Sequence, residues 1–238
     1  MGRILEPPGD VRVGVVIPAA GSGRRMGGVR KPFLELSGEP LLGHALRPFL
    51  ADPRVVCVAV ALGADDAAAP PAWLLSLDAR VRVVEGGATR GESVARGLAA
   101  LPEDVTVIAV HDAARPLVTE ETVSACIEAA ARGEGAVAGC PAVDTMKQVD
   151  AERRITGTPD RSALWHAHTP QVFPAGVLRE AYARGARDAT DDAALVESTG
   201  TPVRMVDDGG SNLKVTRAAD VEVAEAILRA RAAGDTRG

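Results

Sequence analysis

The sequence predicts a doubly wound α/β fold built on a mostly parallel sheet. Apolar, β-branched runs alternate with helical patterns along the first 140 residues. These runs are continuous, which is typical of parallel strands that helices cover on both faces. At 238 residues and 46% hydrophobic content, the chain is long enough to bury a full core. We therefore expect a single domain over residues 1–238.

The expected elements follow one another along the chain. The strands are Val11–Ile17, Val55–Ala61, Val81–Val84, Val105–Val110 and Ala136–Cys140. The helices among them are Leu41–Leu50, Trp73–Leu77, Glu92–Leu101 and Glu120–Arg132. Thr119 directly precedes the last helix and has the side chain of an N-cap.

After Cys140 the pattern changes. Two short alternating segments, Thr145–Val149 and Arg154–Thr158, flank a polar turn and predict a β-hairpin. We expect this β-arm, at about residues 143–160, to reach across to a second copy of the chain. Helical patterns resume at Pro174–Arg187, at Asp191–Ser198 with Thr190 as N-cap, and at Ala218–Ala233.

Composition and charge exclude several classes of protein. The formal net charge of -5 argues against a general nucleic-acid surface. Cys57, Cys126 and Cys140 form no C-x-x-C motif, so we expect buried thiols in a reducing cytoplasm. The apolar runs are shorter than the roughly 18 residues of a membrane span, and the N-terminus has no apolar signal region. The chain is therefore expected to be cytoplasmic and to bind no membrane.

The stretch from Val15 to Met26 is the most informative part of the chain. An apolar run breaks into small residues and glycine, which predicts a buried strand followed by a loop with exposed backbone. Cationic side chains come next, so amide donors and positive charges converge as a triphosphate requires. The residues concerned are Ala19, Ala20, Gly21, Arg24, Arg25 and Lys31.

Two familiar phosphate loops do not fit this stretch. The P-loop needs lysine and a hydroxyl after its second glycine, where this chain has Val29 and Arg30. The dinucleotide fingerprint needs a third glycine, where this chain has Met26. An ordinary βα turn with surface arginines remains the simplest alternative.

A second constellation follows the strand that ends at Val110. Asp112 comes at the carboxyl end of this buried strand, where ligands bind in open α/β sheets. Its carboxylate is a natural ligand for Mg²⁺, which prefers oxygen donors and bridges phosphates. Arg115 adds a cation for a second phosphate. A helix-capping or turn role for Asp112 is the alternative.

A third strand end leads through Gly86 and Gly87 into a helix. The two glycines allow close backbone approach to a flat ligand, and Ala88 continues this loop. Arg90 and Ser93 have groups that can meet a base, ribose or phosphate. Alone, this segment is equally typical of a βα turn.

Scattered loops supply further hydroxyls and cations of the kind that bind a phosphorylated polyol, although each alone is typical of a cap or turn. They are Asp144-Thr145, Asp160-Arg161, Thr169-Pro170-Gln171, Thr190-Asp191-Asp192 and Asn212–Thr216. His166 and His168 could be same-face metal ligands on a strand, but no further Cys or His cluster in the sequence supports zinc.

Taken together and in order, the motifs resemble those of the 2-C-methyl-D-erythritol 4-phosphate cytidylyltransferase family. They are Pro18–Met26, Lys31-Pro32, Gly87-x-x-Arg90-x-x-Ser93, His111–Pro116, Asp144-Thr145-x-Lys147, Leu164–Gln171, Thr190–Ala193 and Asn212-x-Lys214-x-Thr216. The resemblance implies a Rossmann-like fold of the nucleotidyltransferase type, a single cytidylyltransferase domain and a homodimer formed through the β-arm. It also implies Mg²⁺-dependent transfer of a cytidylyl group from CTP to methylerythritol phosphate in isoprenoid precursor biosynthesis, with release of pyrophosphate.

Site residues carry over from the family motif by motif. CTP contacts are implied for Ala19, Ala20, Gly21, Arg24, Arg25, Lys31, Gly87, Ala88 and Ser93, and Mg²⁺ ligation for Asp112. Polyol-phosphate contacts are implied for Arg115, Thr145, Arg161, Thr169, Thr190 and Lys214, some of them from a partner subunit. Catalytic roles are implied for Arg24, Lys31 and Lys214. Ala88 stands where some relatives have an acid, which leaves the detail of that loop open.

Two other functions stay open at this point. A related cytidylyltransferase that uses ribitol 5-phosphate has a similar set of loops, and both acceptors are short phosphorylated polyols. From another class, the chain could be a nucleotide-binding paralogue without turnover, although Lys31, Asp112 and Lys214 together argue against this. A nicotinamide oxidoreductase fits least, because the dinucleotide fingerprint is incomplete.

Overall fold

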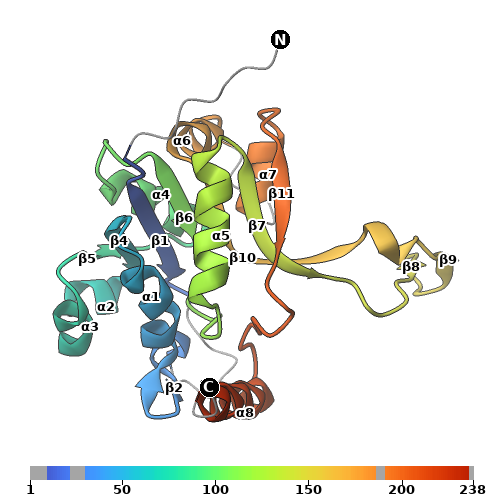
Figure 1. Cartoon of the computed structure of the whole chain (residues 1–238), viewed down its shortest axis with the longest axis horizontal. Helices are drawn as coiled ribbons and strands as arrows, with labels where there is room; N and C mark the ends of the chain where they lie inside the picture. Colours follow the sequence, from blue (N-terminus) through green and yellow to red (C-terminus); the bar gives the residue numbers. More distant parts are fainter. Residues whose placement is uncertain (1–9, 22–29, 186–190, 236–238) are drawn as a thin grey trace.

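The computed structural model describes residues 10–21, 30–185 and 191–235. Seven strands form one sheet in the order β11-β7-β10-β6-β1-β4-β5, with helices on both faces (Figure 1). β10 is antiparallel to its neighbours β6 and β7, and the other pairs are parallel. The predicted mostly parallel α/β sheet is confirmed. The strands are β1 (Val13–Ala19), β4 (Val55–Leu62), β5 (Val81–Glu85), β6 (Val107–Val110), β7 (Gly135–Pro141), β10 (Trp165–Pro174) and β11 (Val203–Asp207).

Helices and short segments connect these strands. The α-helices are α1 (Leu41–Ala51), α2 (Ala64–Ala68), α3 (Ala72–Leu77), α4 (Arg90–Ala100), α5 (Glu120–Ala131), α6 (Ala175–Ala183), α7 (Asp192–Glu197) and α8 (Ala218–Asp235). The 3-10 helices are η1 (Lys31–Phe33) and η2 (Arg161–Ala163), and β2 (Glu35–Leu36) pairs with β3 (Glu39–Pro40). Thr119 caps α5 as predicted, since its hydroxyl accepts a hydrogen bond from the amide of Thr122.

Neighbouring residues of β1 belong to cores on opposite faces of the sheet. Val15 shares a buried cluster with Ile127 of α5, whereas Val16 shares one with Val94 of α4. On the face of the sheet that α4 covers, packing is so close that a Cβ at Gly97 of α4 would lie 2.4 Å from Cγ1 of Val16. A central strand buried on both faces is what the continuous apolar pattern predicts.

The C-terminal helix α8 closes one end of the molecule (Figure 1). Leu117, Val215 and Ala224 join a third buried cluster beneath the sheet. The amide of Val215 also donates to the carbonyl of Ala114 at 2.8 Å. The segment that contains Lys214 is thereby held beside the loop that follows β6.

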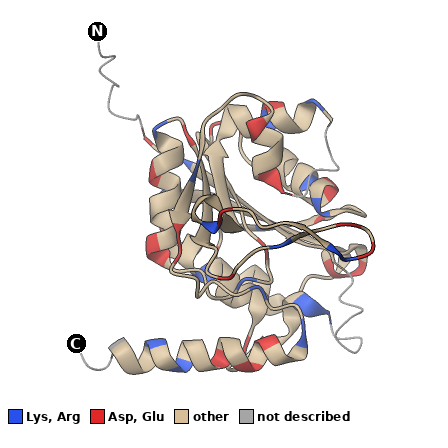
Figure 2. Ribbon diagram, turned by 90° about the vertical axis from the view of Figure 1, so that its right-hand side faces the viewer, with Lys and Arg blue, Asp and Glu red and all other residues tan. Residues whose placement is uncertain are grey.

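The β-arm projects away from the sheet, as Figure 1 shows. Its tip is an antiparallel ladder of β8 (Gln148–Val149) and β9 (Ile155–Gly157), which confirms the predicted hairpin. Acidic and basic residues are both present along it (Figure 2).

Strands β10 and β11 were not expected from the sequence. The first half of β10 is polar and exposed, and Pro170 lies in its middle, so the pattern favours a loop there. β11 is a short edge strand that is only partly buried.

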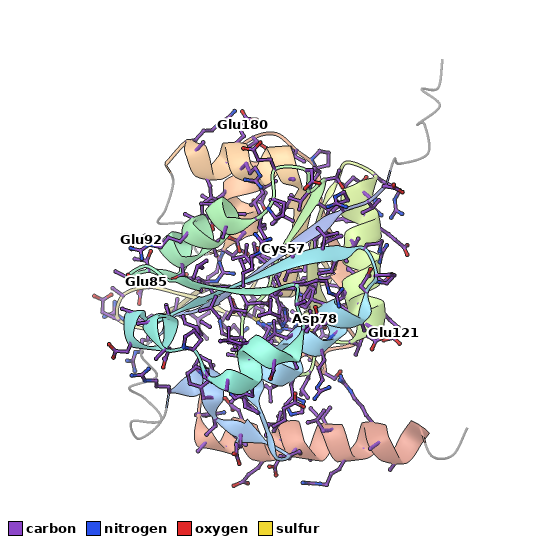
Figure 3. The ribbon with its side chains drawn as sticks, turned by 90° about the vertical axis from the view of Figure 1, so that its left-hand side faces the viewer. Cys57, Asp78, Glu85, Glu92, Glu121 and Glu180 are labelled. Carbon is purple, nitrogen blue, oxygen red and sulfur yellow. The ribbon has the colours of Figure 1, made fainter. Side chains whose placement is uncertain are left out.

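The expectations for two helix starts and one cysteine were wrong. Asp191 caps α7 by accepting from the amide of Ala194, while Thr190 lies outside the described residues. Pro174 ends β10 and precedes α6. Cys57, labelled within the sheet in Figure 3, is buried, but Cys140 is only partly so because it lies near the carboxyl end of β7. Within the described ranges, no helix combines the length and hydropathy needed to cross a membrane.

Candidate active site

A cavity of about 480 Å³ opens at the carboxyl edge of the sheet, beside the ends of β1 and β6 and the loop after β5. This volume is in the range of small-molecule sites. Many of the predicted CTP and metal contacts gather on its wall, although they come from distant parts of the chain. These lining residues are Ala19, Ala20, Gly21, Lys31, Gly87, Ala88, Ser93, Asp112 and Lys214.

The loop between β5 and α4 presents bare backbone to this cavity. A Cβ at Gly86 would lie 2.4 Å from the Cβ of Ala20, so only glycine fits between the two loops. The hydroxyl of the buried Ser93 accepts from the amide of Gly87 at 3.1 Å and donates to the carbonyl of Thr89 at 2.9 Å. Ser93 therefore lines the cavity and also fixes the shape of the loop.

Glu92 supports the same loop from the first turn of α4. Thr89 caps this helix by accepting from the amide of Glu92 at 3.1 Å, and the Glu92 carboxylate accepts from the amide of Ala88 at 2.7 Å. Figure 3 labels Glu92 together with Glu85, which ends β5, on the same side of the molecule. This exchange resembles a capping box and orients the amides that follow β5.

Asp112 lies between two cations. Nε of Arg90 is 3.0 Å from Oδ1 of Asp112, and Nζ of Lys214 is 2.6 Å from Oδ2. Burial opposes ionisation of this carboxyl group, but Arg90 and Lys214 hold its pKa well below the usual range. Arg90 also pairs at 2.9 Å with Asp192, whose side chain is buried. The four charged groups form a neutral network, of which Arg90, Asp112 and Lys214 line the cavity.

A chain of hydrogen bonds fixes the backbone of Asp112 from behind. Its amide donates to the hydroxyl of Thr169 at 3.0 Å, and this hydroxyl lies 3.0 Å from Nδ1 of the buried His111. Nε2 of His111 lies 3.0 Å from the carbonyl of Arg115, which can only accept. A neutral imidazole satisfies both contacts when Nε2 donates and Nδ1 accepts from Thr169. Burial favours this neutral form, because it lowers the pKa of His111 to about 4.

Arg115 and Thr169 lie behind the cavity wall. The guanidinium of Arg115 is buried and donates to the carbonyl of Asn212 at 2.7 Å. Thr169 is likewise buried and engaged with His111 and Asp112. Their geometry gives both residues a positioning role, and contact with a polyol phosphate stays a prediction.

The other predicted acceptor contacts are elsewhere. Thr145 and Arg161 are exposed at the arm, where the Arg161 guanidinium donates to the carbonyl of Val143. Arg24, Arg25 and Thr190 lie outside the described residues. The predicted nucleotide contacts among the described residues therefore lie together at the cavity. Thr145 and Arg161 of the arm do not line it.

Sequence reasoning missed part of the cavity lining. It treated Arg90 as a possible nucleotide contact and did not anticipate its two carboxylate partners. The available signal was the strand end at Gly86–Gly87, which places Arg90 at the same sheet edge as Asp112. Most of the other lining residues that the sequence did not single out lack a chemically distinctive side chain. The lining residues not assigned a role from the sequence are Pro18, Pro32, Thr89, Ala113 and Ala114.

The mostly parallel sheet, with bare glycine loops and fixed charges around one cavity, places the chain among the α/β nucleotidyltransferases. A family model described as "IspD: 2-C-methyl-D-erythritol 4-phosphate cytidylyltransferase" matches residues 13–230. A relative of that name from Symbiobacterium thermophilum is 44% identical over 227 residues, which is 94% of this chain and 95% of the relative. The chain belongs to the 2-C-methyl-D-erythritol 4-phosphate cytidylyltransferase family.

Solved structures agree with this membership. The crystal structure of the Thermus thermophilus enzyme of that name has a TM-score of 0.77 and 36% identity, and covers 92% of this chain and 100% of its own. The 4-diphosphocytidyl-2C-methyl-D-erythritol synthase from Anaerococcus prevotii has a TM-score of 0.82 at 27% identity, with 92% and 97% coverage. The similarity in fold therefore extends over nearly the whole chain, as the predicted fold type requires.

We predict that His111 makes stability depend on pH. Its pKa is about 4 in the folded chain and near 6.5 when unfolded, so the unfolded state takes up its proton first as the pH falls. The contribution of His111 to the free energy of unfolding is fully present above pH 6.5. It declines by roughly 3 kcal/mol in total as the pH falls towards 4. Urea unfolding from pH 7 to 4 should show a shallower loss in His111→Gln than in the wild type.

The exposed His166 provides the control for this measurement. A His166→Gln variant should follow the wild-type pH dependence. Equal slopes for wild type and His111→Gln would contradict the assignment of a neutral buried imidazole.

Proposed function

We propose that this chain transfers a cytidylyl group from CTP to 2-C-methyl-D-erythritol 4-phosphate, giving 4-diphosphocytidyl-2-C-methyl-D-erythritol and pyrophosphate. The observation that carries this proposal is the cavity in which Asp112, Lys214 and Lys31 meet two bare glycine loops. A family match over residues 13–230 supports the choice of substrates. The reaction belongs to isoprenoid precursor biosynthesis.

The chemistry needs no general base. A phosphate oxygen of the acceptor, already ionised at neutral pH, forms a bond to the α-phosphorus of CTP, and the bond to the departing pyrophosphate breaks. The difficulty is to bring two polyanions together, and phosphoryl transfer depends mainly on positioning and charge stabilisation. Unit charges 4 Å apart interact by about 1 kcal/mol in water but about 4 kcal/mol at an effective dielectric near 20. Cations in a partly enclosed cavity are therefore the effective catalysts.

The cations divide this work by position. Lys31, at the start of η1, lines the cavity and stabilises charge that grows on the α-phosphate and the leaving group. Arg24 and Arg25 hold the triphosphate tail. Lys214, paired with Asp112, steadies the region where the two phosphates meet.

Asp112 is suited to hold Mg²⁺ together with phosphate oxygens. Its carboxylate is ionised and lies on the cavity wall, and among the described residues each of its oxygens has one short contact to a cation, so lone pairs remain for a metal. One protein carboxylate with substrate phosphates is a common Mg²⁺ environment. When bound, Mg²⁺ supplies positive charge to the phosphate oxygens.

The β-arm completes the acceptor site of a second copy of the chain. Val143, Val149 and Ile155 of the arm are 73%, 54% and 65% exposed, and apolar side chains that gather on one surface are typical of an interface. We therefore place Thr145 and Arg161 at the polyol phosphate of the partner, with Arg115, Thr169, Thr190 and Lys214 around the same site.

The chain forms one domain with the arm as an insertion at about 143–160. The three free thiols suit the cytoplasm.

The function is tested by pyrophosphate release from a panel of nucleotides and acceptors in the presence of Mg²⁺. CTP with methylerythritol phosphate should give the highest kcat/KM. Faster release with ribitol 5-phosphate would identify the related cytidylyltransferase. CTP binding without release for any acceptor would identify a paralogue without turnover.

We predict that Lys31→Ala lowers kcat by about 10²–10³-fold, because it removes a cation that acts on charge developed in the transition state. Steady-state pyrophosphate release measures this effect. The neighbouring Arg30, whose guanidinium pairs with Asp65 and Asp66, provides a matched control. Arg30→Ala should keep the wild-type kcat, and a near-normal kcat in Lys31→Ala would refute the role of Lys31.

We predict that Arg161→Ala raises KM for methylerythritol phosphate by about 10-fold or more, as expected for loss of a charged hydrogen bond to phosphate. KM for CTP should stay unchanged. Arg154, another exposed arginine of the arm, serves as control, and Arg154→Ala should leave both constants near wild type. Equal increases for CTP and acceptor in Arg161→Ala would contradict the assigned role.

A further inference from the structure

A second cluster of chemically active side chains lies outside the nucleotide cavity. Cys140 is near the end of β7, His168 lies in β10 and Asp208 directly follows β11. Sulfur, imidazole nitrogen and carboxylate oxygen atoms of these residues all lie within 4.8 Å of one another. Only His168 was singled out from the sequence, as a possible metal ligand without support from other residues.

The sheet topology explains why these residues meet. β7 lies between β10 and β11, so groups at its end have neighbours on both sides. Cys140 pairs with His166 in the antiparallel ladder, and the amide of Asp208 donates to the carbonyl of Gly139 at 2.9 Å. The three side chains therefore come from three adjacent strands and converge by backbone geometry.

Asp208 is already fixed in place as an ionised acceptor. Its Oδ2 lies 2.7 Å from Nδ1 of His168 and 3.0 Å from the donating amide of Asn212, and its side chain is 1% exposed. Burial opposes ionisation, but hydrogen bonds from His168, Asn212 and the amide of Gly210 keep the pKa of Asp208 below the usual value. The His168 side chain is 15% exposed, so the cluster has access to solvent.

We propose that Cys140, His168 and Asp208 form a binding site for one thiophilic divalent cation of the zinc class. Thiolate, imidazole and carboxylate are the usual protein ligands of zinc, with bonds of roughly 2.0–2.3 Å, and three of them leave a fourth position open. A magnesium ion would prefer oxygen ligands alone, as at Asp112. The ligand set thus distinguishes this site from the nucleotide cavity.

Charges of both signs lie near the cluster: Asp207 and Asp208 favour an incoming cation, and Arg115 opposes it. Burial, Asp208 and Asp207 raise the pKa of the Cys140 thiol, whereas Arg115 lowers it. Cysteine binds a metal ion as the thiolate, so binding of the ion would release the thiol proton. One thiolate and one carboxylate then neutralise a divalent ion.

Binding would tie the ends of β7, β10 and β11 together. Asp208 also accepts from Asn212, whose amide donates to the carbonyl of Thr169 at 2.8 Å. The ion would thus reinforce the segment that leads to Lys214 without touching the nucleotide. The proposal does not depend on cytidylyl transfer, and its failure would leave that function intact.

Cobalt(II) is a suitable spectroscopic probe for this site. Added to the full chain in excess Mg²⁺, one Co²⁺ per chain should give a thiolate-to-cobalt charge-transfer band, and Zn²⁺ should displace it. Cys140→Ser and His168→Gln should abolish the band. His166→Gln is the matched control, because it removes an exposed histidine two residues away on the same strand, and it should keep the band.

Thiol alkylation gives an independent readout. Cys57 and Cys126 are buried, so Cys140 should be the thiol that reacts in the folded protein, and Zn²⁺ should slow its reaction. Circular dichroism of each metal-free variant separates loss of the site from loss of the fold. Absence of a charge-transfer band in the folded wild type, or its persistence in Cys140→Ser, would overturn the proposal.

Discussion

The ion pairs of Asp112 with Arg90 and Lys214 are the interaction on which the site depends. They join the end of β6, the start of α4 and the segment before α8, which are far apart in the sequence. A buried carboxylate such as Asp112 is costly unless it is paired, and solvent weakens the contribution of the partly exposed Arg90 and Lys214. The convergence of these three segments is therefore favoured when both cations are in place.

Around this charged centre, polar side chains hold the main chain of the cavity wall in place. Gly86 lies too close to Ala20 for any side chain at that position. The side chains of Ser93 and Glu92 accept hydrogen bonds from main-chain amides of the same loop. His111 has the same kind of role behind Asp112, where a neutral ring links Thr169 to the carbonyl of Arg115. Side chains thus fix the shape of the cavity, and Lys31, Arg90 and Lys214 are cations on its wall.

The sequence was sufficient for the parallel core because its strands are continuous apolar runs, and it placed Asp112 correctly because strand ends meet at one edge of such a sheet. It was insufficient for β10, whose polar half and Pro170 contradict the usual strand pattern. Pairings such as Arg90 with Asp192 depend on tertiary proximity that no local pattern encodes. The same limit explains why Cys140 was not connected with His168.

The charge balance of the cavity indicates why so many cations surround it. Asp112 and Asp192 cancel Arg90 and Lys214, so this network adds no net positive charge for a ligand. A nucleoside triphosphate and a phosphorylated acceptor together bring several negative charges into a medium where repulsion is stronger than in water. Under the proposed function, the balancing charge comes from outside the network, from Lys31, Arg24, Arg25 and a divalent ion. Under the proposed function, Arg90 and Asp192 then hold Asp112 and Lys214 in place, and the added cations act together with them on the reacting phosphates.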